Sequence, residues 1–269
     1  MNWKFASHSI FGLTFITIGL IGLASGTFAP IWNPVPETVP ARDVLQWITV
    51  LVAVGCGAGL LARRTAALAA LALLAFLFVW TAFFKVPFII RAPLEEVSYQ
   101  STGENAVLIA GAWVLYCAFS RNQRFPAGKA GVRLAYALYS LALIAFGLSH
   151  FVYLEMTAPL VPSWLPGPVF WAYGTGAIYL ACGFVILVGS TRWGSIAAAL
   201  QIGLITVLVW GPIVIAGKLS AMHWQETIVS VLHERRRYGP IVVARRSASK
   251  RWNVWRSATP LTCVSASSL

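Results

Sequence analysis

The stretch that decides the fold is "LIAFGLSHFVYLEMTAPLVPSWLPGPVFWAYGTGAIYLACG", residues 143–183. It contains an apolar run, a turn marked by prolines and a second apolar run. A looser copy, "ITIGLIGLASGTFAPIWNPVPETVPARDVLQWITVLVAVGCG", occupies residues 16–57. Proline has no N–H to donate and clashes with the preceding helical turn. Each copy therefore predicts two helices joined by a loop.

The composition places these helices in lipid. The chain of 269 residues is 58% hydrophobic and 10% charged, whereas soluble domains carry about 25% charged residues. So apolar a chain cannot cover a surface that faces water. We therefore predict an all-α, polytopic helical membrane protein.

The two copies keep a constant spacing. Five residues of the first copy recur 126 positions later, and the pairs are Val35/Val161, Pro36/Pro162, Pro40/Pro166, Cys56/Cys182 and Gly57/Gly183. Two further pairs, Arg64/Arg192 and Trp80/Trp210, lie 128 and 130 positions apart. This order predicts a tandem duplication, with repeats at residues 1–126 and 127–231. A unit of four helices is even, so the repeats should be parallel and related by an axis along the membrane normal.

The apolar runs predict about seven membrane spans, at residues 10–28, 44–61, 66–84, 105–119, 134–154, 169–188 and 196–216. The first run resembles a signal peptide, but a cleaved segment would not form half of a repeat, so we expect a retained helix. The segment "APLEEVSYQSTGE", residues 92–104, is expected to be a polar loop. Glu104 would then open the fourth span, where a carboxylate complements the helix dipole. Lys85 and Arg91 could each pair with Glu95 or Glu96, and such exposed pairs add little stability.

Tryptophans and glycines have expected places as well. Trp32 and Trp47 are expected at the membrane surface, where tryptophan is enriched. Gly55, Gly57 and Gly59 resemble a helix-packing face of small residues.

The distribution of charge predicts an orientation. Eight basic residues fall on one predicted side of the membrane, namely Lys4, Arg63, Arg64, Arg121, Arg124, Lys129, Arg133 and Arg192. Four fall on the other side, namely Arg42, Lys85, Arg91 and Lys218. Cytoplasmic loops are rich in Lys and Arg, so the N-terminus is expected in the cytoplasm.

Residues 232–269 differ from the rest of the chain. Residues 234–269 hold 8 of the 20 Lys and Arg residues, and this concentration in a tail argues against a nucleic-acid partner. Each arginine of Arg235–Arg237 would cost about 2.5–3.5 kcal/mol at the centre of a membrane helix. The repeat order places an eighth span here, so we predict a disordered basic tail in place of the last helix. Either a frame change near Val231 replaced that helix, or the tail is native and binds anionic lipid headgroups.

Ionisable residues near the predicted outer surface are candidate functional groups, because burying them in a membrane is costly. The candidate acid–base groups are His150, Glu155, Glu104 and Glu226. The candidate contacts for a quinone head are His150, Tyr153, Trp164 and His223. His150 and Tyr153 are three residues apart and are expected to share a helix face. The alternative is that these groups only satisfy loop backbone and helix ends. No H-E-x-x-H or C-x-x-C motif occurs, so no metal site is predicted.

The sequence resembles the DoxX and DoxX-like family over roughly residues 10–226. The resemblance is carried by the Pro-Val-Pro loop at 34–36, Ser-His-Phe at 149–151, Val-Pro-x-Trp-x-Pro at 161–166 and Gly-Glu at 103–104. It implies a four-helix membrane unit, here present twice, in the bacterial inner membrane. It also implies a link to quinone or thiol redox chemistry. The chain departs from the family pattern after about Val231.

Three hypotheses for function follow. The first is a membrane subunit linked to quinone redox chemistry, with no metal or flavin of its own and no catalytic activity without a membrane or soluble redox partner. The second is a small-solute transporter, for which Gln201 is the main polar residue at mid-depth. The third is a purely structural protein whose partner is the lipid bilayer.

Overall fold

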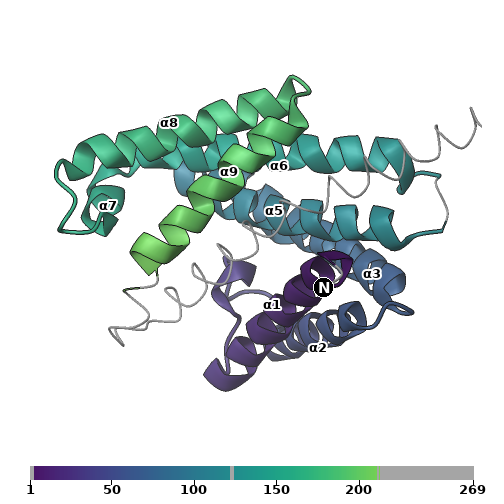
Figure 1. The fold of residues 1–269 in the computed structure, drawn as a ribbon. Helices are drawn as coiled ribbons and strands as arrows, with labels where there is room; N and C mark the ends of the chain where they lie inside the picture. The colour runs from purple at the N-terminus through teal and green to yellow at the C-terminus, as the bar shows by residue number, and fades with distance from the viewer. Residues whose placement is uncertain (1–2, 122–123, 211, 213–269) are drawn as a thin grey trace, which may run out of the picture.

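The structure is a computed structural model that describes residues 3–121, 124–210 and 212, and every regular element within them is helical. The elements are α1 (Trp3–Ser25), η1 (Pro30–Trp32), α2 (Arg42–Leu61), α3 (Ala66–Trp80), η2 (Thr81–Lys85), α4 (Val86–Arg91), α5 (Glu96–Phe119), α6 (Gly128–Val152), α7 (Leu154–Thr157), η3 (Ala158–Leu160), α8 (Pro168–Leu187), α9 (Thr191–Ile205) and η4 (Thr206–Trp210). Figure 1 shows α5 in the middle of the molecule, between a group formed by α1, α2 and α3 and a group formed by α6, α8 and α9.

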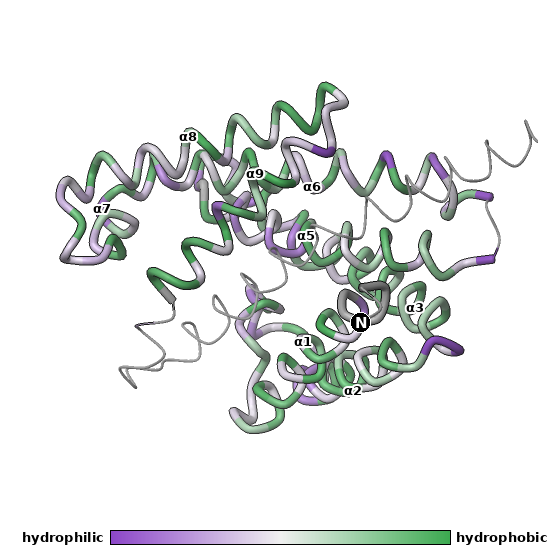
Figure 2. Tube along the Cα trace, viewed as in Figure 1, coloured by the Kyte–Doolittle hydropathy of each residue, from purple (hydrophilic) through white to green (hydrophobic). Residues whose placement is uncertain are grey.

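Seven helices of the described ranges are long and apolar enough to cross a membrane. Apolar residues run along most of their length, and polar residues lie at several turns and along part of α5 (Figure 2). Large apolar side chains face outward on these helices, among them Leu68, Phe83 and Phe170. A helix pairs its backbone N–H and C=O groups within itself, and lipid offers no hydrogen-bonding groups that could pair them instead. The predicted fold class of an all-α polytopic membrane protein with about seven spans is therefore confirmed.

The two halves follow the same order of elements. α2 and α8 are each 20 residues long, and each begins after a residue in the left-handed conformation, Ala41 with φ 52° and Gly167 with φ 73°. α3 and α9 are each 15 residues long, and each continues into a π-helix of 5 residues, η2 and η4. Corresponding elements start 125 or 126 positions apart, close to the spacing of the sequence copies.

The helix pairs α1–α2 and α6–α8 touch through equivalent small residues. A Cβ on Gly57 would lie 2.6 Å from the Gly12 carbonyl oxygen. A Cβ on Gly183 would lie 2.9 Å from the Ser140 carbonyl oxygen. Close backbone approach through small residues is how membrane helices gain van der Waals contact. Of the predicted packing glycines, Gly57 is at such an approach, whereas Gly55 faces open space.

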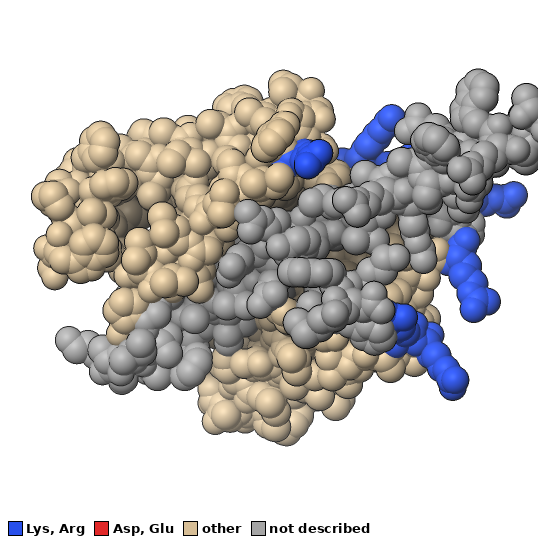
Figure 3. Space-filling model, in the orientation of Figure 1, with Lys and Arg blue, Asp and Glu red and all other residues tan. Residues whose placement is uncertain are grey.

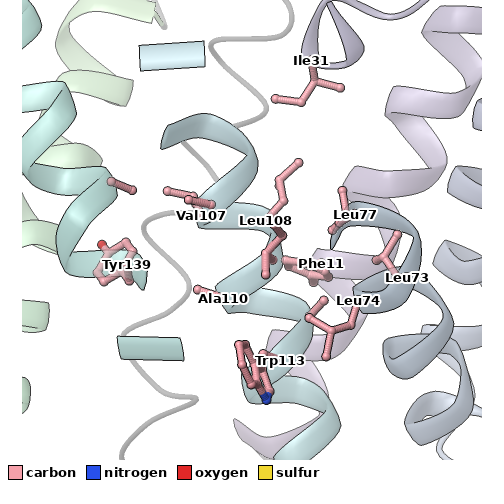
Figure 4. Packing of buried hydrophobic residues seen from close by; sticks show 14 of the residues in the cluster. Phe11, Ile31, Leu73, Leu74, Leu77, Val107, Leu108, Ala110, Trp113 and Tyr139 are labelled. Carbon is pink, nitrogen blue, oxygen red and sulfur yellow. The ribbon is translucent and has the colours of Figure 1, made fainter. Parts of the chain in front are cut away.

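The core lies where α5 meets its neighbours. α5 is the most buried of the seven spans, and it packs on α3 and α6. Leu108 of α5 lies in one buried cluster with Phe11, Leu74 and Leu77 (Figure 4). The central place of α5 means that both groups of helices depend on it.

Two predicted span boundaries were wrong. α5 begins at Glu96 and not at Asn105, because its polar residues find partners inside the helix; Thr102 Oγ1, for example, donates to the Ser98 carbonyl oxygen at 2.7 Å. Glu104 therefore lies within the helix and does not cap it. The third span continues through η2 and α4 to Arg91, since Pro87 lies in the first turn of α4, where a missing N–H costs little.

The predicted surface position of Trp32 was also wrong. Trp32 is 1% exposed, while Trp47 is 52% exposed. Trp32 lies in η1, which folds inward and places the indole against Trp80 and Phe76 at ring distances of 5.3 Å and 5.6 Å. The proline-rich segment is thus partly core.

Replacing Gly57 by alanine should force α1 and α2 apart, since the new methyl group would meet backbone atoms that cannot move aside. We expect Gly57→Ala to lose about 1–3 kcal/mol of stability, the usual cost of overpacking. Gly55→Ala, two residues away in open space, should be neutral or gain up to ~1 kcal/mol from helix propensity. Unfolding of both variants in detergent, followed by circular dichroism, measures the difference; equal stability would contradict the close approach.

Candidate functional site

Lys85 is a fully buried cation within a membrane span. Its side chain is 0% exposed. The ammonium donates hydrogen bonds to the Asn33 carbonyl oxygen and, at 2.7 Å, to Ser101 Oγ. Ser101 Oγ in turn donates to the Asn33 carbonyl oxygen at 3.2 Å. The expected exposed pair with Glu95 or Glu96 is therefore not what Lys85 forms.

The π-helix η2 aligns Lys85 with Trp80. Trp80 Nε1 donates to the Trp32 carbonyl oxygen at 3.0 Å, and Lys85 donates to the carbonyl of the next residue, Asn33. The two donors are five residues apart. The wider π-turn places residues at this spacing closer to the same side of the helix than an α-helix would. Single π-turns occur frequently at functional sites. Here the turn fastens the first proline-rich loop to the end of the third span.

Glu104 compensates the charge of Lys85. The carboxylate is half-buried on α5 and exerts a Coulombic attraction on the ammonium. Opposite charges interact far more strongly in a protein interior than in water. A buried ammonium with no such partner would be strongly destabilising. The hydrogen bond from Lys85 to Ser101 joins η2 to the same helix, α5.

Asn105, the next residue of α5, extends this polar cluster. Its side chain is 0% exposed, and its Nδ2 donates to Thr81 Oγ1 at 3.4 Å. Its Oδ1 has no hydrogen-bond partner. A buried amide oxygen of this kind is costly to leave unpaired, so it can accept a hydrogen bond from a further group.

Aromatic rings surround the base of the cluster. The Trp80 ring lies 4.4 Å from Phe84 and 6.0 Å from Phe28 between centroids. These rings form an apolar group around Trp80, one turn before Lys85. Lys85, Ser101, Glu104 and Asn105, with the Asn33 carbonyl, are called the Lys85 cluster below.

His150 lies in the second half, on the side of α6 that faces α8. Its Nδ1 is 2.7 Å from the Phe146 carbonyl oxygen, and its ring centroid is 5.4 Å from that of Tyr179 on α8. A carbonyl only accepts hydrogen bonds, so Nδ1 donates, and in the neutral ring Nε2 is an acceptor. Phe146, one turn earlier on the same face of α6, also packs on Tyr179, with ring centroids 6.3 Å apart, and approaches Gly103 of α5. His150 therefore belongs to the contact between α6 and α8.

Tyr153 does not share a face with His150 as predicted. α6 ends at Val152, and Tyr153 leaves the helical conformation. Its hydroxyl accepts a hydrogen bond from the Val97 N–H at 3.0 Å. That contact satisfies a donor in the first turn of α5, as the alternative reading of these polar groups expected.

The remaining candidates are not brought together. Glu155 is exposed on α7, and Trp164 is 67% exposed in the second proline loop. Glu226 and His223 lie outside the described residues. Of the predicted candidates that the structure describes, Glu104 is the one that belongs to the Lys85 cluster. Within residues 3–121 and 124–210, no three His, Cys, Asp or Glu side chains come close enough to hold a metal ion.

Sequence reasoning missed Lys85 as a site residue, although a signal was present. Lys85 stands alone in "WTAFFKVPFII", residues 80–90, with apolar residues on both sides. An isolated cation inside an apolar span is a functional candidate by default. The early end assigned to the third span hid this signal.

The comparisons with known proteins give little more. A family described as a domain of unknown function (DUF8561) matches residues 139–235. No curated protein and no solved structure matches the chain. The matched region covers α8, α9 and most of α6, so it concerns the second half and not the Lys85 cluster.

Replacing Lys85 by methionine should strongly destabilise the first half, because Glu104 and the Asn33 carbonyl would lose their buried partner. Breaking one side of a buried charge pair costs about 3–5 kcal/mol. Arg91→Met, an exposed cation one turn and a half further on, should stay within about 0.5 kcal/mol of the wild type. Unfolding midpoints in detergent measure both variants.

The double variant Lys85→Met/Glu104→Gln tests whether the two side chains interact with each other. Since Glu104 no longer needs a cation once neutral, the two losses should not add. Strict additivity would show that Glu104 and Lys85 do not interact.

Proposed function

We propose that the chain is a DoxX-like protein of the bacterial inner membrane that acts as a membrane subunit linked to quinone redox chemistry. In this proposal the Lys85 cluster holds the polar head of a quinone or quinol near the outer surface. The observation that carries it is the fully buried ammonium of Lys85 beside the Glu104 carboxylate, at a π-turn within a membrane span.

The chemistry of the cluster suits a quinol head. A protonated amine donates a hydrogen bond to a quinone carbonyl oxygen, and a carboxylate accepts one from a quinol hydroxyl. Oxidation of quinol to quinone releases two protons and two electrons. Glu104 would accept one proton as the quinol hydroxyl loses it, the second proton would pass to the water at the outer surface, and a partner redox protein would take both electrons. Asn105 Oδ1 offers a further acceptor.

A tandem duplication is part of the proposal. It is supported by the common length and spacing of α2 with α8 and of α3 with α9. It is also supported by the two equivalent close approaches, Gly12 with Gly57 and Ser140 with Gly183. The repeats would be 1–126 and 127–231, the second with three helices; the predicted loss of its fourth helix and the basic tail at 232–269 concern residues outside the described ranges.

The proposed orientation has the N-terminus in the cytoplasm. Its support is the separation of charge along the bundle, since the exposed arginines of the α2–α3 and α8–α9 turns lie at one end and Glu37, Glu95 and Glu155 at the other. Basic loops stay in the cytoplasm. The Lys85 cluster would then lie towards the outer surface.

A transporter role has less support. Gln201 is 8% exposed, but its Nε2 donates to the Thr175 carbonyl oxygen of α8 at 2.8 Å. Gln201 therefore fastens α9 to α8. A purely structural role remains the competing reading of Lys85, because the same contacts hold the Asn33 loop in place.

Quinone binding distinguishes these readings. We expect decylubiquinone to quench the tryptophan fluorescence of the detergent-purified protein in a saturable way, since Trp80 lies beside the cluster. Glu104→Gln keeps the size of the side chain and removes its charge, and should weaken binding at least about tenfold, the worth of a charge-assisted hydrogen bond. Glu155→Gln, at an exposed carboxylate, should bind as the wild type does.

Two results would overturn the quinone proposal. Unsaturable quenching would favour the structural reading. Loss of binding in His150→Ala with full binding in Glu104→Gln would move the site to the second half. Helical content and elution volume of each variant confirm that it is folded.

The orientation can be measured separately. In a background without the native cysteines, Arg63→Cys should react with a membrane-impermeant thiol reagent only after the cells are opened. Glu37→Cys should react in intact cells. The reverse pattern would place the N-terminus outside.

A further inference from the structure

The end of the bundle opposite the Lys85 cluster is strongly basic. Seven basic residues are exposed there, namely Arg63, Arg64, Arg121, Arg124, Lys129, Arg133 and Arg192. They come from the α2–α3 turn, the α5–α6 connection, the first turns of α6 and the first turn of α9. Figure 3 shows Lys and Arg side chains standing out at this end, whereas the tan surface at the other end carries none in this view. We call these seven residues the basic end.

Few acidic side chains lie near the basic end to offset its positive charge. The acidic side chains that the structure describes lie towards the other end, in the first proline loop, the first turn of α2, the α4–α5 connection, the first half of α5 and α7; they are Glu37, Asp43, Glu95, Glu104 and Glu155. Screening in physiological salt acts over about 8 Å, so carboxylates on the far side of a membrane do not offset the basic end. The potential there is positive and attracts anions.

The basic end also presents aromatic side chains. Phe125 and Trp193 are each 67% exposed. The Arg192 guanidinium lies 5.5 Å from the centroid of the Trp193 ring. Aromatic rings beside arginines at the ends of membrane helices lie at headgroup level. A phospholipid suits both the arginines and the aromatic rings. Its phosphate accepts hydrogen bonds from the arginines, and its glycerol and acyl region covers the rings.

We propose that the basic end binds the headgroups of anionic phospholipids and holds them around the protein in preference to neutral ones. Arginine is suited to this role because its planar fork can donate two hydrogen bonds to one phosphate. The neighbouring helices place these arginines at the membrane surface, where the phosphates are. The proposal needs neither quinone binding nor the duplication, so it can stand if the proposed function fails.

Lipid retention tests the proposal. The wild-type protein is purified into nanodiscs of equal parts phosphatidylglycerol and phosphatidylcholine, then moved to a neutral detergent, and the retained lipids are counted by native mass spectrometry. We expect phosphatidylglycerol to exceed phosphatidylcholine at least about fivefold, the factor for one basic residue near an anionic surface. Equal retention of the two lipids would overturn the proposal.

Matched pairs of variants locate the binding. Arg63→Gln/Arg64→Gln should lower the ratio several-fold, and so should Lys129→Gln/Arg133→Gln, which keeps the proposal testable if one pair fails to fold. Arg42→Gln/Arg91→Gln removes the same charge from the opposite end and should leave the ratio unchanged. An equal fall in all three pairs would show that only net charge matters, which contradicts a local site.

Free phosphate separates a lipid surface from a simple anion site. Phosphatidylglycerol in detergent micelles should raise the unfolding temperature of the wild type, whereas inorganic phosphate at the same concentration should not. A rise of equal size with inorganic phosphate would overturn the assignment to lipid.

Discussion

Hydrocarbon offers no hydrogen bonds, and this constraint shapes both the helices and the Lys85 cluster. Each span satisfies its own backbone, but the first proline loop folds inward and brings the Trp32 and Asn33 carbonyls with it. Trp80 Nε1 and the Lys85 ammonium supply the missing donors. A buried cation then needs a counter-charge, which Glu104 provides from α5. The loop, the third span and α5 are held together by this chain of requirements.

The absence of a hydrophobic force between helices in lipid explains the rest of the packing. Lipid tails are as apolar as leucine, so helices associate through close contact of small residues. Gly57 approaches Gly12, and Gly183 approaches Ser140 in the corresponding pair. α5 then joins the two groups through Leu108 and its neighbours. Charge completes the arrangement, because basic side chains gather at one end of the bundle and acidic ones at the other.

Much of the fold could be predicted because membrane helices are recognisable from the length and composition of their apolar runs. The number of spans and the turns at Arg63 and Arg192 were predicted correctly. The start of α5 was not, because Ser98, Ser101 and Thr102 read as a polar loop when their partners are unknown. Those partners are carbonyl oxygens of the same segment and the ammonium of Lys85. Polar residues in a membrane helix are interpretable only once their neighbours are seen.

The sequence by itself determined that this is a helical membrane protein of about seven spans, with proline-rich connections and an asymmetry of charge. These properties depend on composition and on the order of neighbouring residues. A long apolar run is stable in lipid as a membrane-spanning helix, so the spans follow directly from the sequence. The tertiary structure alone decided that Lys85 is buried, that Glu104 of another helix provides its counter-charge, and that His150 faces α8. Such pairings join residues from separate helices. They depend on how each helix is rotated about its own axis, and this rotation is set by packing and cannot be predicted from a local sequence pattern.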